Sequence, residues 1–167
     1  MRLVIVPGDG IGPEIVARAF AEAPEVMKGC FVVGNMAVMR RAAGFLPGLM
    51  LPVVELDSVG EEPPPRSLPV FPAVEMAEPW IAPGRVDARA GAFAGQCVQW
   101  AARAALVGDV SAIVTAPLHK EALHAAGYPY PGHTELLQAE AAAHAGLAIG
   151  QMPVRMMLAN AELRTVL

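Results

Sequence analysis

One stretch of the chain, Asp109 to Glu135, holds the side chains best suited to bind a small molecule. His133 and Thr134 stand there in the sequence Gly-His-Thr-Glu. An imidazole and a hydroxyl can both donate hydrogen bonds, and a protonated histidine adds charge, so the pair suits an anionic, hydroxylated ligand. The competing interpretation is structural: Thr134 caps a helix that begins at Glu135, and His133 packs beside Tyr130. The local residues do not separate the two interpretations.

The same stretch predicts the elements that position this pair. The apolar, β-branched run from Ser111 to Thr115 predicts a buried strand, and helices are expected from Leu118 to Ala126 and from Glu135 to about His144. His119 and Lys120 lie just after the strand. Open α/β sheets bind ligands beyond the carboxyl ends of their strands, so these loops predict a binding site. Lys120 either adds positive potential near a phosphate or is a solvated loop lysine.

The N-terminus predicts a strand, a glycine turn and a helix. Leu3 to Val6 is an apolar β run, and PGDGIGPE follows it. Gly8, Gly10 and Gly12 give G-x-G-x-G, whereas dinucleotide-binding turns have G-x-G-x-x-G. Glu14 adds a negative charge where a pyrophosphate would lie, so the glycines are better explained by a tight turn alone. We expect the apolar face of the helix to contain Ile15, Val16, Ala19 and Phe20.

Further strand and helix signals alternate along the chain. They are a strand from Cys30 to Val33, a helix capped by Asn35 that runs to about Ala43, a third apolar segment from Leu51 to Leu56, a stiff proline-rich loop from Asp57 to Ser67, and the longest helix from Asp87 to Val107. Pro52 makes the third segment a poor central strand. Trp100 is expected in the core or an interface, and Glu140 in the solvated part of its helix. The alternation predicts an α/β fold with a largely parallel sheet.

Composition and charge exclude several classes of protein. Hydrophobic residues make up 54% of the 167 residues, and a net charge of −4 with a pI near 5.5 leaves no basic face for nucleic acid. Charged residues interrupt every long apolar run, and the first apolar run is too short for a signal peptide. We therefore expect a cytoplasmic protein that does not contact a membrane. Cys30 and Cys97 lack metal-ligand or redox spacing, which predicts buried free thiols.

Two motifs carry a family resemblance. VTAPLHKEALHAAGYPYPGHTELL, followed by VRMMLANAELRTVL, resembles the 4-hydroxythreonine-4-phosphate dehydrogenase family of vitamin B6 synthesis and its relatives that act on phosphorylated sugar acids or dihydrodiol carboxylates. The match is good from about Pro83 to Leu167 and loose before it. GDGIGPE also resembles the opening of the isocitrate and isopropylmalate dehydrogenases, the superfamily of these enzymes, but this turn is two residues shorter than in the nearest relatives.

The resemblance implies a fold and its extent. The fold is an isocitrate/isopropylmalate dehydrogenase-like layered α/β/α sheet that is incomplete at the C-terminus. Residues 1–167 form the N-terminal half, with no independent internal boundary. By the same resemblance, Leu163 to Leu167 is the return strand of a hairpin that begins with the strand Val154 to Leu158. The local alternative is that Asn160 caps a terminal helix.

The resemblance also implies a reaction. The family oxidises and decarboxylates 4-phosphohydroxy-L-threonine with NAD and a divalent metal ion, works as a homodimer, and contacts its small phosphorylated hydroxy-acid substrate through residues that match His133 and Thr134. Its metal-binding histidines and most NAD contacts match positions beyond Leu167. No catalytic, metal or cofactor residue is therefore assignable in this chain, and we expect the 167-residue chain alone to have little or no activity. His119, His124 and His144 show no ligand spacing.

Other functions stay open. The chain could be a non-catalytic remnant that binds a small anion or a partner chain. A related acyl- or phosphotransferase is disfavoured because no nucleophile with an adjacent base stands out. Within the family, the substrate could also be a phosphorylated four-carbon sugar acid or a dihydrodiol carboxylate. The sequence does not decide the metal or the choice between NAD and NADP.

Overall fold

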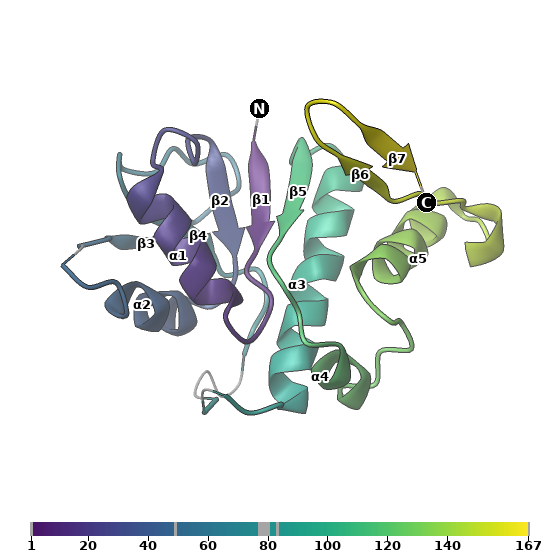
Figure 1. Cartoon of the computed structure of the whole chain (residues 1–167), viewed down its shortest axis with the longest axis horizontal. Coiled ribbons are helices and arrows are strands. Elements are labelled where there is room, and N and C mark those ends of the chain that lie inside the picture. Colours follow the sequence, from purple (N-terminus) through teal and green to yellow (C-terminus); the bar gives the residue numbers. More distant parts are fainter. Residues whose placement is uncertain (1, 49, 77–80, 83, 167) are drawn as a thin grey trace.

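The computed structural model describes residues 2–48, 50–76, 81–82 and 84–166. Within them, five parallel strands form one sheet in the order β3-β4-β2-β1-β5. The strands are β1 (Leu3–Val6), β2 (Cys30–Val33), β3 (Val53–Glu55), β4 (Leu68–Phe71) and β5 (Ala112–Thr115). The helices are α1 (Gly12–Glu22), α2 (Met36–Gly44), α3 (Ala88–Leu106), α4 (Lys120–Ala125), α5 (His133–Ala145) and the short η1 (Ile149–Gln151). Because β1 pairs with β5 in parallel, the turn after β1 and the loop after β5 are neighbours at the carboxyl ends of the strands (Figure 1).

Side-chain alternation along the strands divides the core into two clusters. Val4 and Val6 of β1 pack with Phe31 of β2 in a cluster that also contains residues of α3 and α5. Ile5 and Val32 belong to the other cluster, with residues of α1 and α2. Successive residues of a strand point to opposite faces, so helices cover both sides of the sheet. The predicted layered α/β/α fold is confirmed.

Helix α3 lies across one face of the sheet, as its periodicity predicts. Its N-cap is Asp87, whose Oδ1 accepts a hydrogen bond from the backbone N–H of Arg89 at 2.8 Å. Trp100 packs edge-on against Phe31, with ring centroids 6.4 Å apart, so its role is packing. Helix α2 likewise begins at its predicted cap, because Asn35 accepts from the backbone N–H groups at the start of that helix.

Two expectations about burial are wrong, and one strand was not predicted. Strand β5 is largely exposed, because it pairs with β1 at the edge of the sheet and is not a buried strand. Ile15 is 45% exposed, since the buried side chains of α1 are those of Pro13, Val16, Ala17 and Phe20. That set follows the i, i+3, i+4, i+7 spacing of one helix face. The unpredicted strand is β4, which begins directly after the expected proline-rich loop and lies between β2 and β3.

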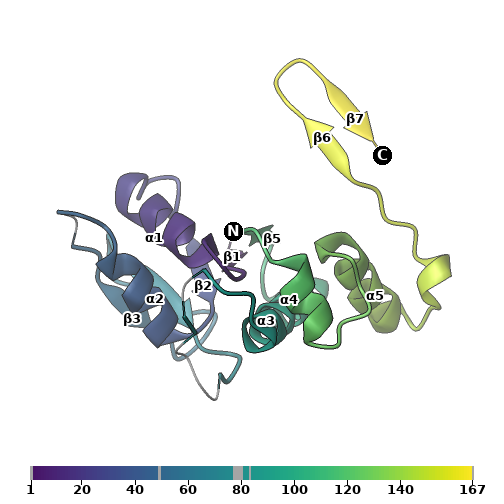
Figure 2. The ribbon, with the colours of Figure 1, turned by 60° about the horizontal axis from the view of Figure 1, so that its bottom comes forward.

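The last elements form a hairpin of β6 (Met157–Ala159) and β7 (Arg164–Val166). Asn160 lies in its turn and accepts hydrogen bonds from the backbone N–H groups of Glu162 (2.9 Å) and Leu163 (2.7 Å). The hairpin interpretation is therefore confirmed, and a helix capped by Asn160 is wrong. Figure 2 shows the hairpin standing away from the helices, and all its described residues are exposed. None of the described helices combines the length and the apolar character needed to span a membrane.

Candidate substrate-binding site

The turn after β1 is packed tightly against the loop after β5. A Cβ atom on Gly8 would lie 2.2 Å from the carbonyl oxygen of Pro117, and one on Gly12 would lie 1.7 Å from the carbonyl oxygen of Pro7. Gly8 also has a φ of +68°, which disfavours a side chain. Neither glycine can be replaced without moving backbone. Gly8 therefore allows close contact between the two loops, and Gly12 allows close contact within the turn.

Asp9 joins these two loops through its side chain. The residue is 9% exposed, and its Oδ1 accepts a hydrogen bond from the backbone N–H of His119. His119 is the N-cap residue of α4, and no side chain within that helix caps it. Asp9 thus satisfies a backbone donor at the start of α4 from a distant part of the sequence. Sequence reasoning did not single out Asp9, although an acidic residue between two turn glycines was a usable signal.

Helix α3 positions α4 and the loop that follows it. A Cβ atom on Gly91 would lie 2.1 Å from the carbonyl oxygen of Ala122, so the two helices touch backbone to backbone. At Gly95 an added Cβ would lie 2.5 Å from the Tyr128 ring. The hydroxyl of Tyr128 donates a hydrogen bond to Gln99 Oε1 at 3.0 Å. These contacts fix the chain between α4 and α5.

Glu140 fixes α5 against α3. Its carboxylate accepts hydrogen bonds from Gln99 Nε2 and Arg103 Nε, each at 2.8 Å. The side chain of Glu140 is only 10% exposed, whereas that of Arg103 is 67% exposed. The expectation that Glu140 is solvated is wrong, because two residues of α3 enclose its carboxylate. The orientation of α5, and of the residues at its N-terminus, rests partly on this contact.

Helix α5 begins at His133, with Gly132 as its N-cap residue and no side-chain capping bond. The expectation that Thr134 caps a helix starting at Glu135 is therefore wrong, because Thr134 is already the second helical residue. The first N–H groups of a helix have no acceptor within it and carry the positive end of the helix dipole. His133 and Thr134 thus lie where a helix favours an anion.

His133 has a ring nitrogen that lacks a partner. Its Nε2 is buried and makes no hydrogen bond within the part of the chain that the structure describes. Burial lowers the pKa of the imidazole, and the negative charge of Asp9 opposes that shift. A buried polar atom without a partner costs free energy, and a bound ligand could satisfy it.

Lys120 also reaches the N-terminus of α5. A Cβ atom placed on Gly132 would lie 4.0 Å from Lys120 Cε and 3.8 Å from Glu135 Oε2. Lys120 is exposed, and it occupies the first turn of α4. Its ammonium group adds positive charge beside the helix terminus, although the carboxylate of Glu135 offsets part of it. His133, Thr134 and Lys120 therefore form one cluster at the carboxyl edge of the sheet.

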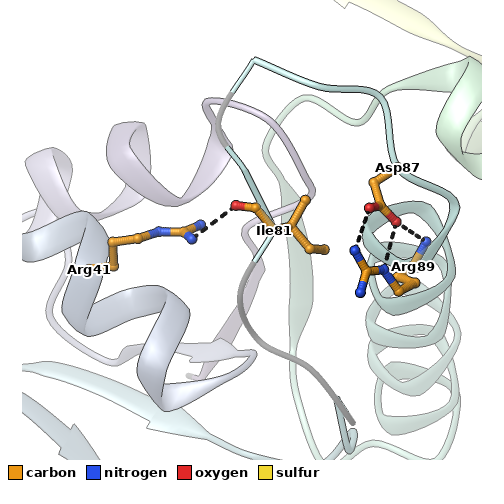
Figure 3. Close-up of polar contacts among 4 residues, drawn as sticks. All are labelled: Arg41, Ile81, Asp87 and Arg89. Carbon is orange, nitrogen blue, oxygen red and sulfur yellow. Dashed lines mark hydrogen bonds and ion pairs between the residues drawn. The ribbon is translucent and has the colours of Figure 1, made fainter.

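A cavity of about 290 Å³ is lined by Asp9 and His119, among other residues. Arg41 and Asp87 also line the cavity, and Figure 3 shows them on either side of Ile81. Arg41 Nη1 donates to the carbonyl oxygen of Ile81 at 3.2 Å. Lys120, His133 and Thr134 are not among its lining residues, but His119, which lines it, directly precedes Lys120 in the sequence. Its apolar lining includes Pro7, Pro13, Val38, Met76, Val86 and Phe93.

Asp87 and Arg89 form a second polar pair in Figure 3. Asp87 Oδ2 accepts from Arg89 Nη2 at 2.8 Å. The side-chain hydrogen bond from Arg89 lowers the pKa of Asp87 to about 2, and its backbone hydrogen bond adds to the shift. The pair stabilises the first turn of α3, because Asp87 also caps that helix. It therefore has a structural role.

The described residues do not form a metal site. They contain no group of three or more His, Cys, Asp or Glu side chains that could hold a metal ion. The turn after β1 is equally unsuited to a pyrophosphate, since Gly8 and Gly12 are already pressed against backbone and Glu14 occupies the first turn of α1. The chemistry that these residues support is binding and orientation of an anion.

Comparisons with known proteins agree with the observed fold. Residues 26–167 match the family described as pyridoxal phosphate biosynthetic protein PdxA. A 4-hydroxythreonine-4-phosphate dehydrogenase of Beijerinckia indica is 38% identical over 99% of this chain and 47% of its own length. A D-threonate 4-phosphate dehydrogenase of Salmonella typhimurium is 44% identical over 81% of this chain and 42% of its own length.

A solved structure extends the comparison to three dimensions. The 4-hydroxythreonine-4-phosphate dehydrogenase of Klebsiella pneumoniae matches with a TM-score of 0.82 and 34% identity, covering 99% of this chain and 49% of that one. The chain thus spans about half the length of the relatives that it matches. The sequence match and the structural match indicate the same family, and the chain belongs to the PdxA family.

Proposed function

We propose that this chain is the N-terminal, substrate-binding half of a dehydrogenase that oxidises and decarboxylates 4-phosphohydroxy-L-threonine in pyridoxal phosphate synthesis. The observation that carries the proposal is the buried, unpartnered Nε2 of His133 at the N-terminus of α5. Lys120 lies near Gly132, the N-cap residue of this helix, and Thr134 follows His133 with a hydroxyl that makes no capping hydrogen bond. The names of the relatives support a phosphorylated hydroxy acid as the substrate.

Each residue has a binding role in this proposal. The N-terminus of α5 and the ammonium group of Lys120 attract an anionic group of the substrate. Burial lowers the pKa of His133, which favours the neutral imidazole, and a neutral imidazole can donate from one ring nitrogen. Thr134 donates or accepts through its hydroxyl. Together they orient the substrate for reaction.

NAD and a divalent metal ion belong to the proposal by family resemblance. NAD would take the hydride, and the metal ion would polarise the developing ketone as a Lewis acid. The described residues contain no group of side chains that could hold the metal ion, and the turn after β1 does not suit the pyrophosphate of NAD, so we assign neither binding site within this chain. We therefore expect the 167-residue chain alone to bind substrate but to show little or no turnover. A cytoplasmic homodimer is part of the same proposal.

A chimaera tests the proposed reaction. Residues 1–167 would be joined to the C-terminal half of the Beijerinckia indica relative and assayed for NADH formation with 4-phosphohydroxy-L-threonine. We expect turnover that falls about a hundredfold in His133→Ala and about tenfold in Thr134→Val, since each loses a polar contact to the substrate. Glu121→Gln on the exposed face of α4 is the matched control and should keep the activity. Full activity in His133→Ala would overturn the proposal.

The substrate has a second candidate. The Salmonella typhimurium relative that is 44% identical is a D-threonate 4-phosphate dehydrogenase, so the same chimaera should be assayed with D-threonate 4-phosphate. The ratio of the two kcat/KM values decides between the substrates. Binding of either compound by the 167-residue chain, combined with an inactive but folded chimaera, would favour a non-catalytic anion-binding protein.

A further inference from the structure

We propose that Gln99 of α3 is a positioning residue, whose side-chain amide binds the chain on both sides of His133 and Thr134 and holds this pair in place to receive the substrate. The inference rests on the proposed function, because it assumes that His133 and Thr134 contact the substrate. It adds a residue of α3 to a site otherwise built from α4 and α5.

The amide of Gln99 joins two residues that lie on either side of the start of α5. Its Oε1 accepts a hydrogen bond from the hydroxyl of Tyr128 at 3.0 Å, and its Nε2 donates to Glu140 Oε1 at 2.8 Å. Tyr128 precedes His133 in the sequence, and Glu140 follows it within the same helix. One side chain of α3 therefore fastens this segment at both ends, with His133 and Thr134 between the two contacts.

The two partners dictate which atom of the amide faces each of them. The carboxylate of Glu140 accepts hydrogen bonds, so the atom of Gln99 that faces it has to be the donor nitrogen. Burial raises the pKa of Tyr128, so its phenol stays protonated at neutral pH and donates to the remaining oxygen of Gln99. A glutamate at position 99 would lack the donor, and a methionine would lack both groups.

Gln99 lies in the middle of a stripe along α3. Gly95, Gln99 and Arg103 recur every four residues, so they lie on one face of that helix. A Cβ atom on Gly95 would lie 2.5 Å from the Tyr128 ring, so this ring packs against the helix backbone. Arg103 Nε and Nη2 donate to the two carboxylate oxygens of Glu140 at 2.8 and 3.2 Å. The stripe thus contacts both ends of the segment, and Gln99 contacts both ends at once.

Helix α5 transmits this attachment to His133. Glu140 follows His133 by about two helical turns, so the two side chains lie on the same face of α5. Leu136 lies between them on that face and is fully buried in the core. A helix held at Glu140 alone would still allow its first turn to move, whereas the second contact at Tyr128 restrains the chain that enters it. Small displacements of a binding group weaken catalysis strongly, so this restraint bears on function.

The substitution Gln99→Met removes both hydrogen bonds and retains an unbranched side chain of similar length. Gln96→Met is the matched control, because Gln96 is an exposed residue of the same helix. Circular dichroism establishes that each variant is folded, and urea denaturation measures its free energy of unfolding.

NMR relaxation of the 167-residue chain without ligand gives the first readout. We expect the backbone order parameters of His133 and Thr134 to fall from about 0.85 toward about 0.6 in Gln99→Met and to stay unchanged in Gln96→Met. A merely structural role would lower the free energy of unfolding but leave the order of these residues in the folded state as in wild type. Unchanged order parameters and amide shifts at His133 and Thr134 in folded Gln99→Met would overturn the inference.

Binding of 4-phosphohydroxy-L-threonine to the same chain gives the second readout. The Kd should rise about tenfold in Gln99→Met and stay unchanged in Gln96→Met. An equal Kd in wild type and Gln99→Met would overturn the inference. A wild-type chain that does not bind this compound would count against the proposed function, whereas loss of order at His133 in the ligand-free Gln99→Met chain would still support the positioning role.

An exchange of the two groups serves if Gln99→Met does not fold. Gln99→Glu keeps the acceptor for Tyr128 but sets a second carboxylate against Glu140, so the order of His133 should fall. Adding Glu140→Gln restores a donor and an acceptor in the reverse direction, and the order parameters and the Kd should return close to their wild-type values. Order at His133 that is unaffected by Gln99→Glu, or not recovered in the double variant, would contradict the inference.

Discussion

Glu140 Oε2 of α5 forms an ion pair with Arg103 Nε of α3 at 2.8 Å, and the Glu140 side chain is only 10% exposed. The carboxylate also accepts from Gln99, which in turn accepts from the hydroxyl of Tyr128. This chain of hydrogen bonds joins α3, α5 and the loop between α4 and α5. The N-terminus of α5, where His133 and Thr134 lie, is therefore attached to the central core by polar contacts as well as by the buried side chain of Leu136.

Glu140→Ala should lower the free energy of unfolding by about 1 to 3 kcal/mol, because it removes hydrogen bonds to a mostly buried carboxylate. Urea denaturation measures the change. Glu22→Ala is the matched control, since Glu22 pairs with Arg18 at the surface of α1, with side chains 51% and 68% exposed. That control should lower the free energy of unfolding by about 0.5 kcal/mol or less. Equal effects of the two substitutions would show that the contact with α3 is not a stabilising one.

Gly91→Ala should destabilise the protein by about 1 to 3 kcal/mol, because the added Cβ would overlap the backbone of Ala122. The comparison is Gly44→Ala at the end of α2, where nothing lies within 4 Å of an added Cβ. Alanine there should be neutral or stabilising by up to about 1 kcal/mol. Thermal unfolding of both variants checks the prediction, and similar stabilities would mean that α3 and α4 are not in backbone contact.

The stability of the chain should depend on the protonation of His133. Burial lowers the pKa of this group in the folded state below its ordinary value of 6.5. Between the lowered value and 6.5, the unfolded state binds more protons, so the free energy of unfolding rises with pH in this window and levels off above it. Urea midpoints measured against pH should show this slope in wild type, and His133→Gln should reduce it. An identical slope in the variant would exclude His133 as its source.

Both cysteines should be inert in the folded protein. Cys97 is 1% exposed, and burial raises the pKa of its thiol to about 12. Burial also raises the pKa of the Cys30 thiol. Since the thiolate is the reactive form, Ellman's reagent should label neither residue at mildly alkaline pH, and both should react in concentrated urea. Rapid labelling of the folded chain would contradict the described burial.

Helix caps and short apolar runs in the sequence correctly predicted several helices and strands. Asn35 and Asp87 are both strong cap residues, and each accepts backbone hydrogen bonds at the start of the expected helix. The strand at 3–6 and the strand at 30–33 were recognisable as short apolar runs. Pro52 predicted that the following segment is a poor central strand, and β3 indeed lies at the edge of the sheet.

Distant contacts explain what the sequence did not reveal. Strand β4 contains Pro69, and it forms because β2 and β3 pair with it on either side, which outweighs its weak local preference. Asp9 and His119 are 110 positions apart, so no local pattern predicts their hydrogen bond. Glu140 was expected in solvent because it is charged, but its partners lie on another helix. The roles of His133 and Thr134 as substrate contacts stay predictions.

The most direct test of the proposed site is an NMR titration of the 167-residue chain with 4-phosphohydroxy-L-threonine. The backbone amides of His133, Thr134 and Glu135 should shift most, because the N-terminus of α5 faces the anion, and Lys120 should shift with them. Thr134→Val should weaken the effect, and Glu121→Gln should not. Shifts confined to other parts of the chain, or shifts unchanged in Thr134→Val and His133→Gln, would contradict a substrate site at this helix terminus.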